Sequence, residues 1–130
     1  MSLASAAPQA SSLVAERSVL GAILIDPEAM LRIRDRLSPD DFYDSVNRRI
    51  YEACVGLFDQ RRSVDWVMLN DVLKNDAQFS DIGGLAYLTE LPTMTPTASL
   101  VEQHAEVVRE KSNLRALARA GLRIAGLGTQ

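Results

Sequence analysis

The sequence predicts an all-α protein, a compact multi-helix bundle followed by one long helix. Apolar residues recur at a spacing of three or four along most of the 130-residue chain, and no segment shows the strict alternation of a half-buried strand. Proline, glycine and capping residues divide this pattern into short helical segments. The last segment contains only Gly121 as a helix breaker between residues 99 and 125, which predicts a helix far longer than the average of about 11–12 residues.

The composition predicts one domain with an aliphatic core. Hydrophobic residues make up 47% of the chain but aromatic residues only 5%. The net charge of −3 disfavours a nucleic-acid-binding domain, because such domains usually carry a basic footprint. The arginine clusters at 32–36, 48–49 and 61–62 have acidic neighbours and are interpreted as solvated helix faces.

The single cysteine, Cys54, excludes an intramolecular disulfide and a zinc site built on several thiolates. Its apolar neighbours predict a small buried residue. The longest apolar run, 19–25, is too short to span a bilayer, and the first residues lack the features of a signal peptide. We therefore expect a cytoplasmic protein with a disordered leader over 1–11.

The first predicted helix covers 13–25, with Ser12 as its cap and Glu16 favouring the helix dipole. Gly21 lies inside this helix, which predicts the close approach of another helix. The apolar stripe consists of Val19, Leu20, Ile23 and Leu24.

Asp26-Pro27 and Ser38-Pro39 are predicted to start a helix to about residue 37 and a short helical turn carrying Phe42 and Tyr43. Met30, Ile33 and Leu37 share one side of the former. A longer helix is predicted over 46–60.

Asp65 is expected to cap a helix over 66–75, with Leu69, Val72 and Leu73 pointing inward. Residues 76–81 and Gly83-Gly84 are interpreted as loops, followed by a short helix that Pro92 ends. A globular bundle over 12–94 is thus followed by a linker and the long helix over 95–130, where Ser99 and Glu102 form a capping box.

The second half of the long helix carries an apolar face that no later segment covers, which predicts an interface. The alternative is that the helix folds back onto its own bundle. The turn-like tail over 126–130 suggests that the sequence ends within a helical hairpin, of which the long helix is the first arm. The predicted interface residues are Val107, Leu114, Leu117, Ala118, Gly121 and Leu122.

No catalytic, cofactor-binding or metal-ligating constellation is found, so the chain is predicted not to be an enzyme. Gly83-Gly84 is not followed by the lysine of a phosphate-binding loop. His104 is the only histidine and is interpreted as a surface or boundary residue. The carboxylates of Asp40, Asp41 and Asp44 are explained as helix caps. Trp66 and Tyr87 are candidate partner contacts or core residues.

A series of short motifs resembles the N-terminal domain of bacterial DnaB-type replicative DNA helicases. Residues 16–29 (ERSVLGAILIDPEA) resemble the family's opening helix and turn, and 40–43 (DDFY) with 49–51 (RIY) its next block. The remaining matches are Val64-Asp65 with Leu69, 82–84 with Tyr87, Leu88 and Leu91, 95–98, and 107–111. The matches are collinear from about Ser12 to Leu117. Asn47, Trp66 and His104 depart from the family's usual residues.

The resemblance implies a non-catalytic domain in DNA replication. It implies a collar in which helical hairpins pair subunits into dimers and hexamers, and a docking surface for primase, with a helicase loader as a further candidate partner. The parent protein would unwind DNA with ATP and Mg²⁺ in a motor domain absent from this chain. Little or no DNA binding and no membrane contact are implied for this domain itself.

Two other classes remain as alternatives. A stand-alone helical adaptor, such as a helicase-binding domain of primase, would share a similar architecture. A DNA-binding module would need Arg32, Arg34, Arg36, Arg48 and Arg49 to form one basic face.

Overall fold

The chain folds into helices only, which confirms the predicted fold class. The computed structural model describes the backbone of residues 2–95 and 97–128 and the side chains of 12–95 and 97–124, and this part of the chain holds no strand. The helices are α1 (Ser2–Ile25), α2 (Ala29–Ile33), α3 (Ser45–Asp59), α4 (Trp66–Leu73), α5 (Ala77–Asp81), α6 (Leu85–Glu90) and α7 (Val101–Gly128), with 3₁₀ helices η1 (Pro39–Asp41) and η2 (Leu91–Met94).

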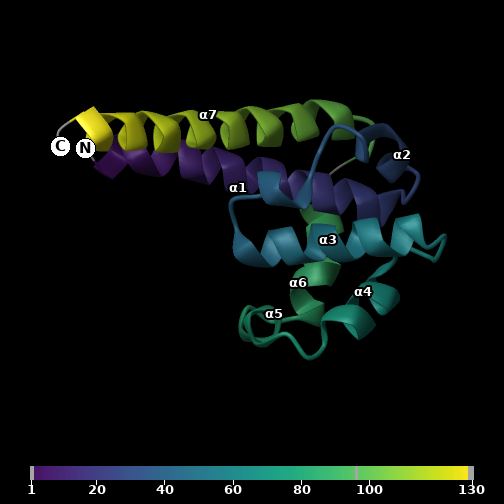
Figure 1. Cartoon of the computed structure of the whole chain (residues 1–130). Coiled ribbons are helices and arrows are strands. Elements are labelled where there is room, and N and C mark those ends of the chain that lie inside the picture. The colour runs from purple at the N-terminus through teal and green to yellow at the C-terminus, as the bar shows by residue number, and fades with distance from the viewer. Residues whose placement is uncertain (1, 96, 129–130) are drawn as a thin grey trace.

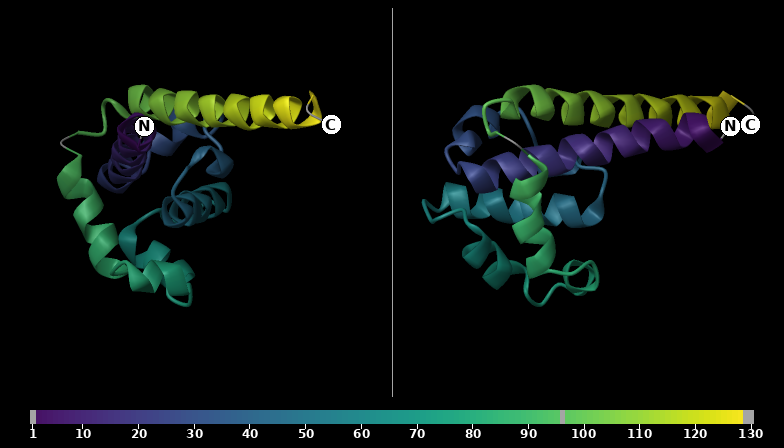
Figure 2. Two further views of the ribbon diagram at one scale, coloured as in Figure 1. Left: turned by 90° about the vertical axis from the view of Figure 1, so that its left-hand side faces the viewer. Right: turned by 180° about the vertical axis from the view of Figure 1, so that it is seen from behind.

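The two long helices, α1 and α7, lie on one side of the bundle, with α3 beneath them and α4, α5 and α6 farther away (Figure 1). They overlap in that view. The view turned by 90° shows that α7 crosses α1 near its own start and then diverges from it toward the C-terminus (Figure 2). The second half of α7 therefore projects from the bundle as an arm.

The core is aliphatic and joins all the longer helices. Val19, Leu20 and Ile23 of α1 are buried, as predicted, and so are Met30 and Ile33 of α2. Further core residues are Leu37, Phe42, Ile50, Tyr51, Cys54, Leu69, Phe79, Leu88, Leu91, Val101, Ala105 and Val108. Cys54 is buried as expected, and burial raises the pKa of its thiol to about 12.

Gly21 lies where α1 packs closely against η2 and the residue that follows it. A Cβ atom at this position would lie 2.5 Å from the carbonyl oxygen of Leu91 and 2.9 Å from Thr95 Cβ, and it would overlap Thr95 Oγ1 as well. The predicted close approach is confirmed, and only a residue without a side chain fits there without movement of η2.

Aspartate caps begin three of the helices. Asp44 accepts a hydrogen bond from Asn47 N, Asp65 from Met68 N, and Asp76 from Phe79 N, at 2.9–3.0 Å. The cap at Asp65 was predicted. The loop predicted over 76–81 was wrong, because the Asp76 cap starts the short helix α5, which buries Phe79.

Several expected boundaries are corrected. α1 begins at Ser2 rather than Leu13, so Ser12 is not a cap; its hydroxyl donates to Glu16 Oε2 instead. α2 ends at Ile33, and η2 continues through Pro92.

At the other end of the chain, α7 starts at Val101, after the proposed capping box, and Ser99 N donates to Thr97 Oγ1. It extends to Gly128, so no turn begins at Gly126.

One further prediction was wrong, and some others concern residues that the structure does not describe. Val72 is 53% exposed, whereas an inward position was expected. Met1, Pro96 of the predicted linker, and the tail residues Thr129 and Gln130 lie outside the described residues. The division into leader, bundle and linker with long helix stays a prediction.

Candidate interaction surface

The first half of α7 is fixed to the bundle. Val101, Ala105 and Val108 are buried in the core. Beyond them, Arg109 Nη1 donates to the carbonyl oxygen of Arg36 at 2.7 Å, and Ser112 Oγ donates to Asp41 Oδ1 at 2.8 Å. These polar contacts to Arg36, before η1, and to Asp41, within η1, therefore fix the direction of α7.

Arg115 is the last residue of α7 that makes several contacts with the bundle. Its Nη2 donates to the carbonyl oxygen of Asp41 at 2.8 Å, and its Nη1 lies 3.5 Å from Ser12 Oγ. The guanidinium also lies 5.2 Å from the centre of the Tyr43 ring, which is a cation–π distance. The arm is the part of α7 from Leu114 to Gly128, and it starts at this level.

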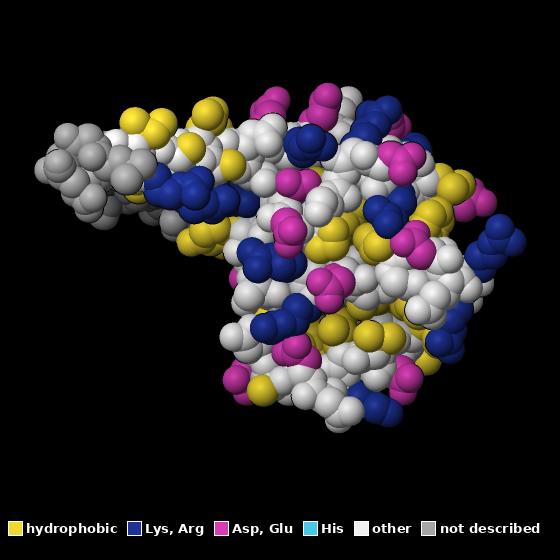
Figure 3. Space-filling model, in the orientation of Figure 1, with side chains coloured by type: hydrophobic (Ala, Val, Ile, Leu, Met, Phe, Trp, Pro, Cys, Tyr) yellow, Lys and Arg dark blue, Asp and Glu magenta, His cyan; other side chains and the backbone are white. Residues whose placement is uncertain are grey.

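The arm carries exposed apolar side chains. Leu114, Leu117, Leu122 and Ile124 are 58%, 68%, 74% and 71% exposed. Figure 3 shows yellow side chains along one edge of the arm. Ala118 and Gly121 are exposed as well, whereas Val107 is partly buried and packs against the core. Five of the six predicted interface residues therefore lie on the arm, and Val107 belongs to the bundle.

Glu16 links α1 to the segment between η1 and α3 and to the start of α3. Its side chain is fully buried, and its carboxylate accepts hydrogen bonds from Tyr43 N at 2.6 Å, Asp44 N at 3.2 Å and Asn47 Nδ2 at 3.1 Å. A buried carboxylate needs such donors to offset its lost hydration. The negative charge also lies at the N-terminus of α3, where the helix dipole favours it.

From the sequence, Glu16 was predicted only to interact favourably with the helix dipole in the first turn of its helix. A usable signal was present, because Val19, Leu20 and Ile23 follow Glu16 at helical spacing and so place it on the buried face of α1.

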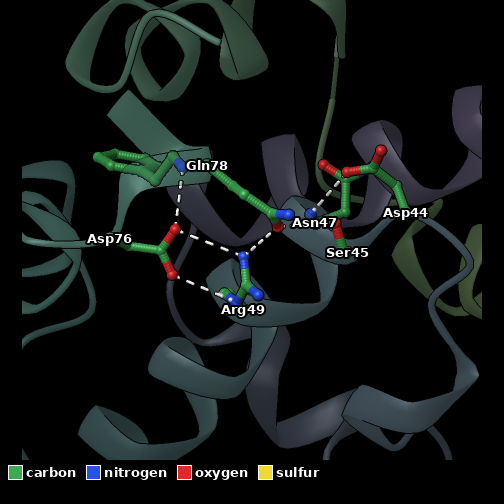
Figure 4. A network of polar contacts seen from close by, with 7 residues as sticks. Asp44, Ser45, Asn47, Arg49, Asp76 and Gln78 are labelled. Carbon is green, nitrogen blue, oxygen red and sulfur yellow. Dashed lines mark hydrogen bonds and ion pairs between the residues drawn. The ribbon is translucent and has the colours of Figure 1, made fainter. Parts of the chain in front are cut away.

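A second polar network ties α3 to α5 (Figure 4). Arg49 forms an ion pair with Asp76 at 3.2 Å and donates to Gln78 Oε1, which also accepts from Ser45 Oγ at 3.1 Å. Asp76 thus both caps α5 and pairs with α3.

The two predicted partner contacts lie in different settings. Tyr87 is half-buried, its hydroxyl donates to Asn47 Oδ1, and burial raises its pKa. Trp66 is 48% exposed at the start of α4, so it is not a core residue. The structure does not bring them together with the apolar edge of the arm, and their role in partner contact stays a prediction.

Most of the basic face considered for DNA binding is neutralised by carboxylates. Arg32 pairs with Asp26, Arg34 with Asp59 and Arg36 with Glu102, at 3.7, 2.9 and 3.3 Å. The hydrogen bond from Arg34 holds the pKa of the Asp59 carboxyl below its ordinary value. Together with the Arg49–Asp76 pair, these contacts support the interpretation of the arginine clusters as solvated helix faces.

One concave surface lies between two helices of the bundle. A groove of about 610 Å³ between α3 and α4 is lined by small and aliphatic residues such as Ala53, Gly56 and Val72, together with charged residues such as Arg49 and Glu52. Among the side chains of 12–95 and 97–124, no group of three His, Cys, Asp or Glu residues could hold a metal ion. No described helix is both long and apolar enough to cross a membrane.

Comparison with known proteins identifies the family of this chain. A family model described as the DnaB-like helicase N-terminal domain matches residues 8–110. The chain belongs to this family. The crystal structure of the N-terminal domain of DnaB helicase from Mycobacterium tuberculosis superimposes with a TM-score of 0.84 at 35% identity, covering 91% of this chain and 86% of that one.

The relatives of known function are replicative DNA helicases. DnaB of Geobacillus stearothermophilus is 40% identical over 114 residues, which is 88% of this chain and 25% of the relative. DnaB of Rhodothermus marinus is 42% identical over 104 residues, 80% of this chain and 11% of the relative. The chain thus spans a quarter or less of these helicases and corresponds to the N-terminal DnaB domain.

Proposed function

We propose that this domain mediates the assembly of replicative helicase subunits and the docking of primase, without taking part in ATP hydrolysis. The α7 arm pairs with the arm of a second copy, and pairs associate into the collar of a hexamer. The collar then offers a surface for primase, and a helicase loader is a further candidate partner. DNA unwinding with ATP and Mg²⁺ is assigned to a motor domain outside this chain.

The observation that carries the proposal is the exposed apolar edge of the arm. Leu114, Leu117 and Leu122 are each more than half exposed, and large apolar side chains clustered in this way mark interaction surfaces. Covering several hundred Å² on each subunit would contribute several kcal/mol at about 25 cal/mol per Å², before the cost of association. Ala118 and Gly121 would allow a second helix to approach closely.

The family match favours this assignment over a stand-alone adaptor, because the relatives described above are helicases. Primase docking and collar formation come from the family resemblance, and the exposed arm is compatible with both.

Sedimentation equilibrium over a concentration series tests the assembly role. We expect a dimer or higher oligomer, and we expect Leu114→Asp to shift the mass to that of a monomer. Leu31→Asp is the matched control, because Leu31 is 69% exposed on α2, away from the arm. An oligomer whose mass Leu114→Asp leaves unchanged contradicts the assignment.

A monomer at every concentration would show that the arm does not pair in this chain. A longer chain that continues beyond residue 130 would then separate a need for a second hairpin arm from the absence of pairing.

A further inference from the structure

The charge of the chain is strongly segregated along its length. Residues 111–130 contain four basic side chains and no acidic one, so this stretch carries +4 although the whole chain carries −3. The basic residues are Lys111, Arg115, Arg119 and Arg123. The last three are spaced by four, so they follow one side of α7 with a rise of about 6 Å from each to the next.

These arginines differ from those on the bundle in their partners. Arg34, Arg36 and Arg49 each pair with a carboxylate. Within the described part of the chain, Arg115, Arg119 and Arg123 form no ion pair, and the hydrogen bonds of Arg115 go to uncharged oxygens. Their positive charge is therefore not neutralised within the described structure.

A concave surface lies where this row of arginines meets the bundle. It has a volume of about 520 Å³ and is lined by Asp40, Phe42, Tyr43, Arg48, Ser112, Arg115 and Arg119. Arg48 also lacks a carboxylate partner among these residues and donates to the carbonyl oxygen of Phe42 at 3.1 Å. Three arginines against one carboxylate give the lining a charge of +2.

Tyr43 adds a feature that an acidic protein partner would not require. Its side chain is 41% exposed at the concave surface, and Arg115 lies over its ring. An exposed aromatic ring beside guanidinium groups is suited to stacking a nucleobase while the arginines bind the adjoining phosphates. Figure 3 shows dark-blue basic side chains along one edge of the arm and yellow apolar side chains along the other.

We propose that Arg48, Arg115, Arg119, Arg123 and Tyr43 form a binding site for single-stranded nucleic acid at the base of the α7 arm. The phosphates follow the arginine row, and one base stacks at Tyr43. The negative total charge does not oppose this site, because screening at physiological salt limits charge interactions to about 8 Å. The apolar edge of the arm stays available for pairing, so the site is independent of the proposed assembly.

Fluorescence anisotropy with a labelled oligo-dT of about 15 nucleotides tests the proposal at about 0.1 M salt, where screening limits charge interactions to about 10 Å and phosphate contacts still contribute to affinity. We expect binding that weakens with salt, with a logarithmic slope of about −2 to −3 for three or four contacts. Arg119→Glu and Arg123→Glu should each weaken binding by about tenfold or more. Arg62→Glu, in the turn that follows α3 and outside the proposed site, makes the same charge change and should leave affinity unchanged within about twofold.

Tyr43 separates base stacking from simple charge attraction. We expect Tyr43→Ala to weaken binding by about tenfold and Tyr43→Phe to retain it. The proposal is overturned if the oligonucleotide does not bind, if Arg119→Glu binds like the unmodified chain, or if polyglutamate displaces the oligonucleotide as well as unlabelled oligo-dT does. The last result would assign the arginines to an acidic protein partner. Sedimentation under the same conditions reports on assembly separately.

Discussion

Replacing Gly21 with alanine tests the packing of α1 against η2, and replacing Gly56 provides a matched control. Both glycines lie within helices, α1 and α3. In the Gly21→Ala variant the new Cβ would meet the backbone oxygen of Leu91 at 2.5 Å and the Thr95 side chain at a similar or shorter distance, whereas a Cβ at Gly56 would meet nothing within 4 Å. The two substitutions are chemically identical and differ only in their surroundings.

The contacts predict opposite signs for the two changes in stability. Alanine gains about 1 kcal/mol over glycine in a helix interior. At Gly56 nothing opposes this gain, so we expect stabilisation by roughly 0.5–1 kcal/mol. At Gly21 the new methyl group must push η2 away, and overpacking costs typically about 1–3 kcal/mol. Because the Leu91 oxygen belongs to the backbone and cannot rotate aside, we expect a net loss of about 1–2 kcal/mol.

Urea denaturation followed by far-ultraviolet circular dichroism measures both variants. The Gly21→Ala variant should also melt about 4–8 °C lower, at about 4 °C per kcal/mol for a domain of this size. Thr95→Ala in the Gly21→Ala background should recover part of the loss, since it removes Thr95 Oγ1, the nearest of the three close contacts, although Thr95 Cβ and the Leu91 oxygen remain. A Gly21→Ala variant as stable as Gly56→Ala would refute the close approach of α1 and η2.

Three further predictions concern buried polar groups. Glu16→Gln should lower the free energy of unfolding by about 2–3 kcal/mol, because a neutral amide accepts fewer hydrogen bonds from Tyr43 N and its neighbours; urea denaturation measures this, and a change below about 0.5 kcal/mol would rule out the network. Cys54 should react with a thiol reagent at neutral pH only as fast as the protein unfolds, since it is buried, and rapid labelling of the native protein would contradict this. Its pKa is raised from 9.0 to about 12, so its contribution to stability is fully present below pH 9 and is lost as the pH rises toward 12. A Cys54→Ala variant should therefore show a shallower stability loss over that alkaline range, and an identical pH profile would count against this assignment.

The helical periodicity and the capping residues were sufficient to predict most of the fold. They predicted the all-α class, the buried stripe of α1, the Asp65 cap and the length of α7. These features depend on contacts between residues three or four apart, which the local sequence specifies. They also indicated that Gly21 faces a close neighbour, although η2 could not be named as that neighbour.

The remaining features arise from residues far apart in the chain. The sequence could not show that the Glu16 carboxylate meets the backbone of Tyr43 and Asp44, or that α7 leaves the bundle beyond Arg115. Both depend on how α1, η1 and α7 cross, which packing of the whole core decides.

The charged residues also show which features the sequence determines and which features depend on folding. The net charge and the acidic neighbours of the arginine clusters can be read directly from the order of the residues. Which arginines are neutralised follows from the folded arrangement, because ion pairs such as Arg36–Glu102 and Arg49–Asp76 join segments far apart in the chain, and a Coulombic contact depends on distance in space rather than along the sequence.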